Sequence, residues 1–190
     1  LGERSFYGRT FEVTPEVLDP RADTETVIEA ALQVIEDRGL RSRKITIADI
    51  GTGSGAILVT LLSELPLAIG IATDISAAAL AVARRNGERH GVADRFKLIH
   101  ARGLEGVDVP VDIVVSNPPY IPSGDICRLA VDVRGYDPLM ALDGGPDGLE
   151  IYREIARDIK AVAPPVAVIL EVGEGQSADV ERIFARAGTA

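Results

Sequence analysis

Short apolar runs that alternate with longer segments of helical periodicity constrain the fold of this chain more than any other feature. Runs rich in Val, Ile and Ala predict strands at residues 45–50, 68–74, 96–100, 111–117 and 166–173. Helices are predicted at residues 24–36, 56–65, 77–91, 148–162 and 177–187. Because two parallel strands need a long crossover between them, the alternation indicates βαβ units. The sequence therefore predicts an α/β fold with a doubly wound, mostly parallel sheet and helices on both faces.

The composition fits one globular domain and excludes several classes of binding partner. With 190 residues and no linker long enough to divide it, the chain is expected to form a single domain over residues 1–190. A net charge of −9 argues against direct binding to nucleic acid, because phosphate groups would be repelled. One cysteine, Cys127, and two histidines predict neither an internal disulfide nor a metal site. The apolar runs are shorter than the roughly 20 residues of a membrane helix, so we expect a cytoplasmic protein without a membrane partner.

A glycine turn joins the first predicted strand to the helix after it. This turn, GTGSG at residues 51–55, lets a ligand approach the backbone closely, and Asp74 at the tip of the next strand can accept hydrogen bonds from ribose hydroxyls. The spacing is not that of a dinucleotide or phosphate-binding loop, so it favours a compact adenosine ligand with a positive centre. Asp49 is expected to help fix the conformation of this glycine turn. The alternatives are a helix N-cap for Asp74 and a purely structural role for Asp49.

The strand predicted at residues 111–117 ends in SNPPY, residues 116–120. One proline is enough to end a strand, so two in a row need a further reason. Placed between an amide side chain and an aromatic ring, they form a stiff segment that holds its polar groups in one orientation. This indicates a functional site, with a rigid exit turn as the alternative.

Several separated motifs together resemble a known family. The glycine turn, the acid of TDIS and SNPPYI look like a class I S-adenosylmethionine-dependent methyltransferase of the N-methylating kind, which implies a Rossmann-like fold. The closer resemblance is to the HemK/PrmC family of peptide chain release factor N5-glutamine methyltransferases. It is carried by VLDPRADTE at residues 17–25, NPPYIP at 117–122, YDPLMALDGGPDGLEIYREI at 136–155 and LEVGEGQ at 170–176.

The resemblance implies S-adenosylmethionine as methyl donor, S-adenosylhomocysteine as product and a release factor as protein partner. The residues it assigns to the donor are Asp49, Gly51, Thr52, Gly53, Gly55, Asp74, Ile75 and Asn117. The residues it assigns to the substrate are Arg21, Thr24, Glu25, Asn117, Pro118, Pro119 and Tyr120. For Arg21, Thr24 and Glu25, the alternative is a helix start with a surface ion pair. For the loop from residue 136, a rigid cover over the sheet is favoured over substrate contact, and Glu171 and Gln176 are expected to be structural.

The chain also departs from the family pattern. The N-terminal helical domain and the C-terminal hairpin of the family are not expected in it, and Asp19 and Ala22 replace the commoner Ile and Pro. After the third strand the family tends to place an acid near the adenine. This chain has HARGLEG at residues 100–106 instead, which leaves the adenine contact undefined.

Asn117, Pro118 and Tyr120 are the expected catalytic residues. If the side-chain oxygen of Asn117 and the backbone carbonyl of Pro118 accept the two N–H bonds of a substrate amide, its nitrogen is fixed facing the methyl group. Tyr120 would form a wall for the planar amide. The same pair of acceptors suits the exocyclic amine of adenine in DNA, so an N6-adenine methyltransferase is the alternative enzyme. A nucleoside-binding protein without turnover is the alternative from another class.

Overall fold

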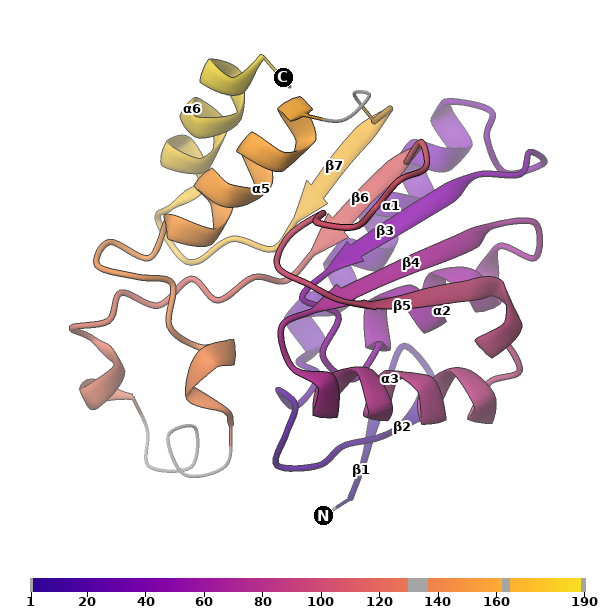
Figure 1. The fold of residues 1–190 in the computed structure, drawn as a ribbon, viewed down its shortest axis with the longest axis horizontal. Coiled ribbons are helices and arrows are strands. Elements are labelled where there is room, and N and C mark those ends of the chain that lie inside the picture. The colour runs from indigo at the N-terminus through magenta and orange to yellow at the C-terminus, as the bar shows by residue number, and fades with distance from the viewer. Residues whose placement is uncertain (1, 130–136, 162–164, 189–190) are drawn as a thin grey trace.

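A central sheet of five parallel strands organises the chain. The computed structural model describes residues 2–129, 137–161 and 165–188. The strands lie in the order β5-β4-β3-β6-β7, as Figure 1 shows. Their bounds are β3 Thr46–Ile50, β4 Ile69–Asp74, β5 Phe96–His100, β6 Ile113–Ser116 and β7 Ala167–Leu170. Every predicted strand contains the observed one, and the predicted doubly wound α/β fold is confirmed.

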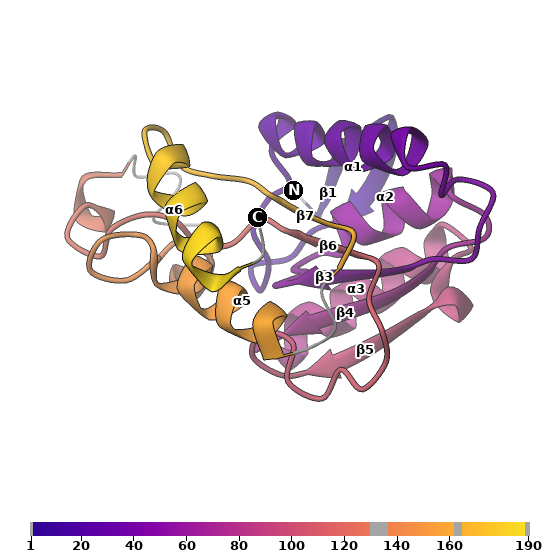
Figure 2. The ribbon, with the colours of Figure 1, turned by 90° about the horizontal axis from the view of Figure 1, so that it is seen from above.

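Helices cover both faces of this sheet (Figure 2). On one face lie α1 Glu25–Asp37, α2 Ala56–Glu64 and α3 Ala77–Arg89, and on the other lie α5 Glu150–Ala161 and α6 Ser177–Ala187. Short 3-10 helices occupy Ala22–Thr24, Ala93–Arg95, Ile126–Arg128 and Leu139–Ala141. All five predicted helices are present, although the predicted end of α5, at residue 162, lies outside the described residues. None of the described helices has the length and apolar composition needed to cross a bilayer.

The sheet separates two apolar layers. Successive strand residues point to opposite faces, so Ile47 packs with the α1 and α2 layer while its neighbour Ala48 packs with α5 and α6. The same alternation places Val114 on the α5 side and Val115 on the α1 side. Because both faces are covered, the inner strands β3, β4 and β6 are mostly apolar and buried on both faces.

An N-terminal hairpin was not predicted from the sequence. Strands β1 (Glu3–Phe6) and β2 (Arg9–Glu12) pair antiparallel around the turn Tyr7-Gly8, where both residues have positive φ. Positive φ at both central residues matches the twist of a two-residue hairpin. Phe6 and Phe11 are buried against the α1 and α2 layer, with their rings 6.0 Å apart in an edge-to-face arrangement. The hairpin therefore extends the core beyond the sheet.

Asn86 in α3 links the hairpin to the glycine turn. Its side chain is fully buried, accepts a hydrogen bond from the Glu12 backbone N–H at 2.7 Å and donates to the Glu12 carbonyl at 3.0 Å. It also donates to the carbonyl of Ser54 at 2.8 Å. One amide side chain thus satisfies three backbone groups from two segments distant in sequence. Unpaired, such buried groups would each carry a desolvation cost.

We therefore expect Asn86→Ala to destabilise the domain. The substitution leaves the buried Ser54 carbonyl and two part-buried backbone groups of Glu12 without their partner, which costs about 2 kcal/mol or more in the free energy of unfolding. For a chain of this size the loss lowers the melting temperature by about 4 to 8 °C. Thermal unfolding followed by circular dichroism measures it. Arg89→Ala is the control, since it breaks only an exposed ion pair with Glu3 and should move the melting temperature by about 1 to 2 °C at most.

Candidate active site

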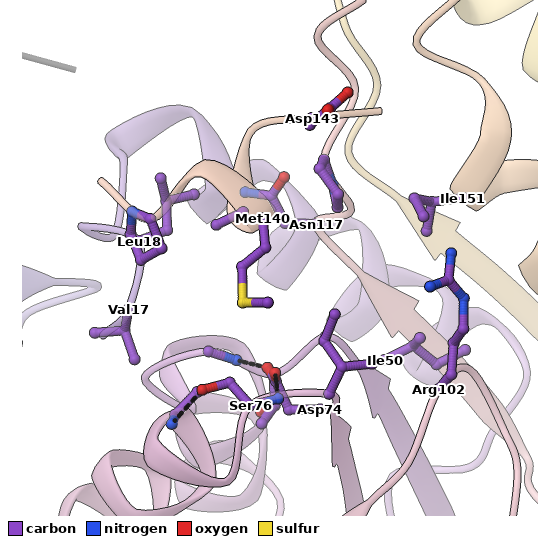
Figure 3. Close-up of a pocket in the computed structure, with 18 of the residues that line it drawn as sticks. Val17, Leu18, Ile50, Asp74, Ser76, Arg102, Asn117, Met140, Asp143 and Ile151 are labelled. Carbon is purple, nitrogen blue, oxygen red and sulfur yellow. Dashed lines mark hydrogen bonds between the residues drawn. The ribbon is translucent and has the colours of Figure 1, made fainter. Parts of the chain in front are cut away.

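A cavity of about 490 Å³ opens at the carboxyl-terminal edge of the sheet. Its walls come from the glycine turn after β3, the tip of β4, the loop after β5, Asn117 after β6 and the loop before α5 (Figure 3). Ligands of open α/β sheets bind at this edge, and the volume lies within the range of small-molecule sites. The segments that the sequence singled out are therefore brought together around one space.

The glycine turn presents an open backbone to the cavity. Gly51 and Gly53 line it and have φ of 68° and 55°, a conformation that favours glycine. A Cβ placed on either residue would meet no atom within 4 Å, so the space beside the turn is free for a ligand. Gly55 has a different role, because it precedes α2 and its Cβ would lie 3.1 Å from that of Ala83. The turn thus fits a compact ligand on one side and a neighbouring helix on the other.

Asp74 lies at the tip of β4 and fastens the turn to it. Its Oδ2 accepts a hydrogen bond from the Gly53 N–H at 2.9 Å, and its Oδ1 accepts one from the Ser76 N–H at 2.8 Å. Burial raises the pKa of Asp74, although these hydrogen bonds oppose the shift. The N-cap of α3 is Ser76, whose hydroxyl accepts from the Ala79 N–H, so Asp74 is not that cap. Each carboxylate oxygen keeps a further lone pair, and Asp74 lines the cavity beside Ile75.

Asp49 lies beneath the turn and does not line the cavity. It is 1% exposed, and its Oδ2 accepts a hydrogen bond from the hydroxyl of Thr52 at 2.7 Å. Its Oδ1 has no hydrogen-bond partner among the described residues. Burial raises the pKa of Asp49 to about 7, with the negative charge of Asp74 adding to the shift. The contact with Thr52 holds the turn, while the other oxygen remains a buried acceptor.

Asn117 is fixed by a hydrogen bond to the start of the first helix. Its Nδ2 donates to the hydroxyl of Thr24 at 3.0 Å, and Thr24 is buried. Because one of its two N–H bonds is given to Thr24, the side chain has its oxygen and one remaining N–H left to meet a ligand. The predicted sites in the segments at residues 21–25 and 116–120 therefore meet through a direct contact.

A second cavity, of about 240 Å³, lies on the other side of Asn117. Pro118 and Tyr120 line this second cavity and not the first, whereas Asn117 and Pro119 line both. The Asn-Pro-Pro segment consequently forms a wall between two spaces, with polar groups available to each. This division fits a reaction in which two molecules meet at one point.

Residues that follow β7 in the chain form hydrogen bonds with Tyr120. Gln176 donates a hydrogen bond to the Tyr120 carbonyl at 2.9 Å, which agrees with the structural role expected for it. The Tyr120 hydroxyl lies 3.4 Å from Oε1 of Glu171, a residue that also lines the second cavity. Burial and the nearby charge of Glu171 raise the pKa of Tyr120. Tyr120 is therefore a neutral phenol at physiological pH.

The two charged residues expected beside Thr24 have different surroundings. Arg21 lines both cavities and forms an ion pair with the buried Asp137 at 2.6 Å. Glu25 lines neither, and its Oε1 accepts a hydrogen bond from the Tyr7 backbone N–H at 2.8 Å. Arg21 is thus available to a ligand, and Glu25 holds the hairpin turn.

Other lining residues were missed in the sequence. The loop after the 3-10 helix Leu139–Ala141 is ordered by Asp143, which accepts hydrogen bonds from the Ser123 hydroxyl at 2.7 Å and the Gly145 N–H at 2.9 Å. Its residues line the cavity as well as covering the sheet. The missed lining residues used below or labelled in Figure 3 are Val17, Leu18, Ile50, Ser76, Arg102, Met140, Asp143, Ile151 and Glu154. Their signal was the position of most of them in the motif segments 17–25 and 136–155, which the sequence analysis quoted without assigning these residues a role.

Curated relatives confirm the resemblance carried by the sequence motifs. A protein of Bradyrhizobium diazoefficiens named release factor glutamine methyltransferase is 45% identical over 188 residues, which cover 98% of this chain and 63% of that protein. A protein of Cereibacter sphaeroides with the same name is 46% identical over 191 residues, covering 100% of this chain and 66% of that protein. The chain therefore spans slightly less than two thirds of the length of these relatives.

Solved structures show the same fold at low sequence identity. The N-terminal domain of human METTL16 in complex with SAH has a TM-score of 0.63 at 18% identity, over 94% of this chain and 66% of that one. A ribosomal protein L11 methylase from Lactobacillus delbrueckii has a TM-score of 0.58 at 20% identity, over 88% of this chain and 69% of that one. The class I methyltransferase fold implied by the motifs is thereby confirmed. Residues 25–131 match the family described as Methyltransferase small domain, and the chain belongs to that family.

Proposed function

We propose that this domain transfers a methyl group from S-adenosylmethionine to the side-chain amide nitrogen of a glutamine in a peptide chain release factor. The observation that carries the proposal is the position of Asn117, which lines both the cavity at the glycine turn and the cavity at Tyr120. The name shared by the curated relatives supports the choice of substrate. Such a substrate would place the enzyme in the cytoplasm, where translation ends.

The first cavity is the proposed donor site. Gly51, Thr52 and Gly53 offer an open backbone, and Asp74 offers carboxylate lone pairs to ribose hydroxyls beside the apolar Ile75. The bound donor supplies an electrophilic methyl carbon attached to a sulfonium. An acidic carboxylate such as Asp74 near this cavity suits a ligand that carries a positive centre and no phosphate.

The second cavity is the proposed acceptor site. An amide nitrogen is a weak nucleophile because its lone pair is delocalised into the carbonyl. Asn117 Oδ1 and the backbone carbonyl of Pro118 accept the two N–H bonds, which turns the nitrogen toward the first cavity and stabilises the positive charge that develops on it. The fixed φ of the two prolines keeps that carbonyl in place. The proton leaves the nitrogen after the methyl group has been transferred.

Three neighbours support this arrangement. Thr24 accepts one N–H bond of Asn117 and so holds the side chain with its oxygen free for the acceptor amide. Tyr120 supplies one wall of the acceptor cavity, and Arg21 lines both spaces. A net charge of −9 favours a protein acceptor over DNA, because a DNA backbone would be repelled.

The proposed reaction is tested with a labelled methyl donor and two acceptors. We expect label on a purified release factor and none on duplex DNA of mixed sequence. Mass spectrometry should then locate the added methyl group on a glutamine side chain. Label on DNA alone would establish the adenine-methylating alternative, and donor binding without transfer to either acceptor would indicate a binding protein.

Replacing Asn117 should separate binding from turnover. In Asn117→Ala the amide loses one of its two acceptors, so turnover is expected to fall about 100- to 1000-fold. The affinity for S-adenosylhomocysteine should change by no more than about twofold, since the glycine turn and Asp74 are intact. Single-turnover kinetics and calorimetry measure the two quantities. Unchanged turnover would remove Asn117 from the mechanism.

Thr24 allows a matched pair of variants that tests positioning. Thr24→Val keeps the shape of the side chain and removes the hydroxyl that holds Asn117, so turnover should fall about tenfold, the equivalent of one hydrogen bond. Thr24→Ser keeps the hydroxyl and should retain most of the turnover. A merely structural role would lower the melting temperatures of the two variants in proportion to activity. Equal turnover in both would contradict the role assigned to Thr24.

A further inference from the structure

The purine base of the donor has a defined place in the first cavity, if the proposed donor site is correct. Parallel pairing sets Asp74 beside His100, the last residue of β5. The Ala101 N–H donates to the Asp74 carbonyl at 3.1 Å, and a His100 ring nitrogen lies 2.9 Å from the carbonyl of Ile75. The loop after β5 is thereby fastened to the residues that meet the ribose. Ala101, Arg102 and Gly103 of this loop line the cavity next to the proposed ribose contact, within reach of an attached base.

The loop brings an ion pair to the cavity. Arg102 and Glu154 both line the cavity, although Glu154 belongs to α5, which covers the sheet face opposite α1, α2 and α3. Nε of Arg102 donates to Glu154 Oε2 at 2.7 Å, and Nη2 donates to Oε1 at 2.8 Å. This two-point contact holds the guanidinium and the carboxylate in one plane. In Figure 3 the guanidinium of Arg102 extends upward beside Ile151.

Both members of the pair retain hydrogen-bonding capacity. Nη2 carries a second hydrogen, and Oε1 carries a further lone pair, so a donor and an acceptor lie side by side 2.8 Å apart. Nη1 of Arg102 has no hydrogen-bond partner among the described residues. The side chain of Glu154 is only 17% exposed, so the pair is set into the wall of the cavity.

We propose that Arg102 and Glu154 together recognise the N1 and N6 edge of the adenine in the donor. Glu154 Oε1 accepts a hydrogen bond from the N6 amino group, and the Arg102 guanidinium donates to N1. Adenine presents a donor at N6 next to an acceptor at N1, which is the complement of the acceptor and donor that the pair offers. The proposal rests on the function proposed above and adds the residues that select the base.

This assignment accounts for the departure of the chain from its family at HARGLEG. The acid that would accept from N6 comes from α5 instead of the loop, and Arg102 both positions it and adds a contact to N1. A loop side chain next to Arg102 would not fit, because a Cβ on Gly103 would lie 1.8 Å from Oδ2 of Asp158. That oxygen accepts the Leu104 N–H at 2.9 Å, which keeps the loop against α5.

Arg157 supplies a matched control on the same carboxylate. It lies 3.9 Å from Oε1 of Glu154, but it is 74% exposed and does not line the cavity. Removing Arg157 therefore removes a positive charge near Glu154 without touching the proposed base contact. A weak exposed pair of this kind contributes little by itself.

The test compares two nucleoside ligands by calorimetry on the full 190-residue chain. S-adenosylhomocysteine carries adenine, while S-inosylhomocysteine carries hypoxanthine, whose N1 is a donor and whose C6 oxygen is an acceptor. We expect the unsubstituted chain to prefer the adenine ligand by about tenfold or more. Arg102→Ala and Glu154→Ala should each weaken binding of the adenine ligand about tenfold and reduce the preference to about twofold. Arg157→Ala should bind both ligands as the unsubstituted chain does.

The preference is a ratio within each variant, so a partly unfolded sample does not alter it. If Arg102→Ala binds the adenine ligand as tightly as the unsubstituted chain, or weakens both ligands equally, the assignment is wrong while the donor site stands. If the unsubstituted chain binds neither ligand, the proposed donor site is wrong and the assignment fails with it.

Discussion

The proposed donor cavity depends on the parallel pairing of β3 with β4 on one side and with β6 on the other. The register sets Ile50 beside Thr73 and Asp49 beside Val115, so the three strands end at the same level of the sheet. The chain therefore leaves them close together, as the glycine turn, as Asp74 and as the Asn-Pro-Pro segment. A shift of one strand by a single residue would exchange the side chains that face the two helical layers and would separate these groups. The chemistry of the site is fixed by the packing of the sheet.

At the boundary between the two cavities, the packing of the fold determines the orientation of Asn117. Asn117 is tied to Thr24 at the start of α1, and α1 is itself packed on the sheet through its buried apolar face. The orientation of one amide therefore depends on the position of a whole helix. Because Thr24 and the inner face of α1 are buried, the oxygen proposed to meet the acceptor is held without a flexible intermediate. Such rigidity suits a reaction that relies on alignment more than on acid–base chemistry.

Periodicity in the sequence was enough to predict the five strands of the parallel sheet, the five described α-helices and the fold class. Residue type and order predicted the glycine turn, Asp74 and Asn117, because each follows directly from the end of a strand. The hairpin was missed because its strands are short and bury only Phe6 and Phe11. Contacts between distant segments left no local signal.

The pairing of Arg102 with Glu154 joins residues 52 positions apart and arises only when β5 and α5 are folded together. The contact of Asn86 with Glu12 spans 74 positions and has the same origin. Local sequence patterns predict the secondary structure at a given residue, but they do not predict which distant segments will lie side by side. The cavity wall was therefore only partly predictable, although its main polar groups were.

Asn86 has a consequence for the behaviour of the molecule as a whole. Its amide satisfies the backbone of the hairpin and the carbonyl of Ser54 at the same time, so both segments share one buried anchor. Opening of the hairpin exposes that anchor to water, which then competes for the hydrogen bond that it donates to the Ser54 carbonyl. Fluctuations of the amino-terminal strands and of the glycine turn are thus coupled through Asn86, and we expect a ligand seated on the turn also to slow the fraying of strands that it never touches.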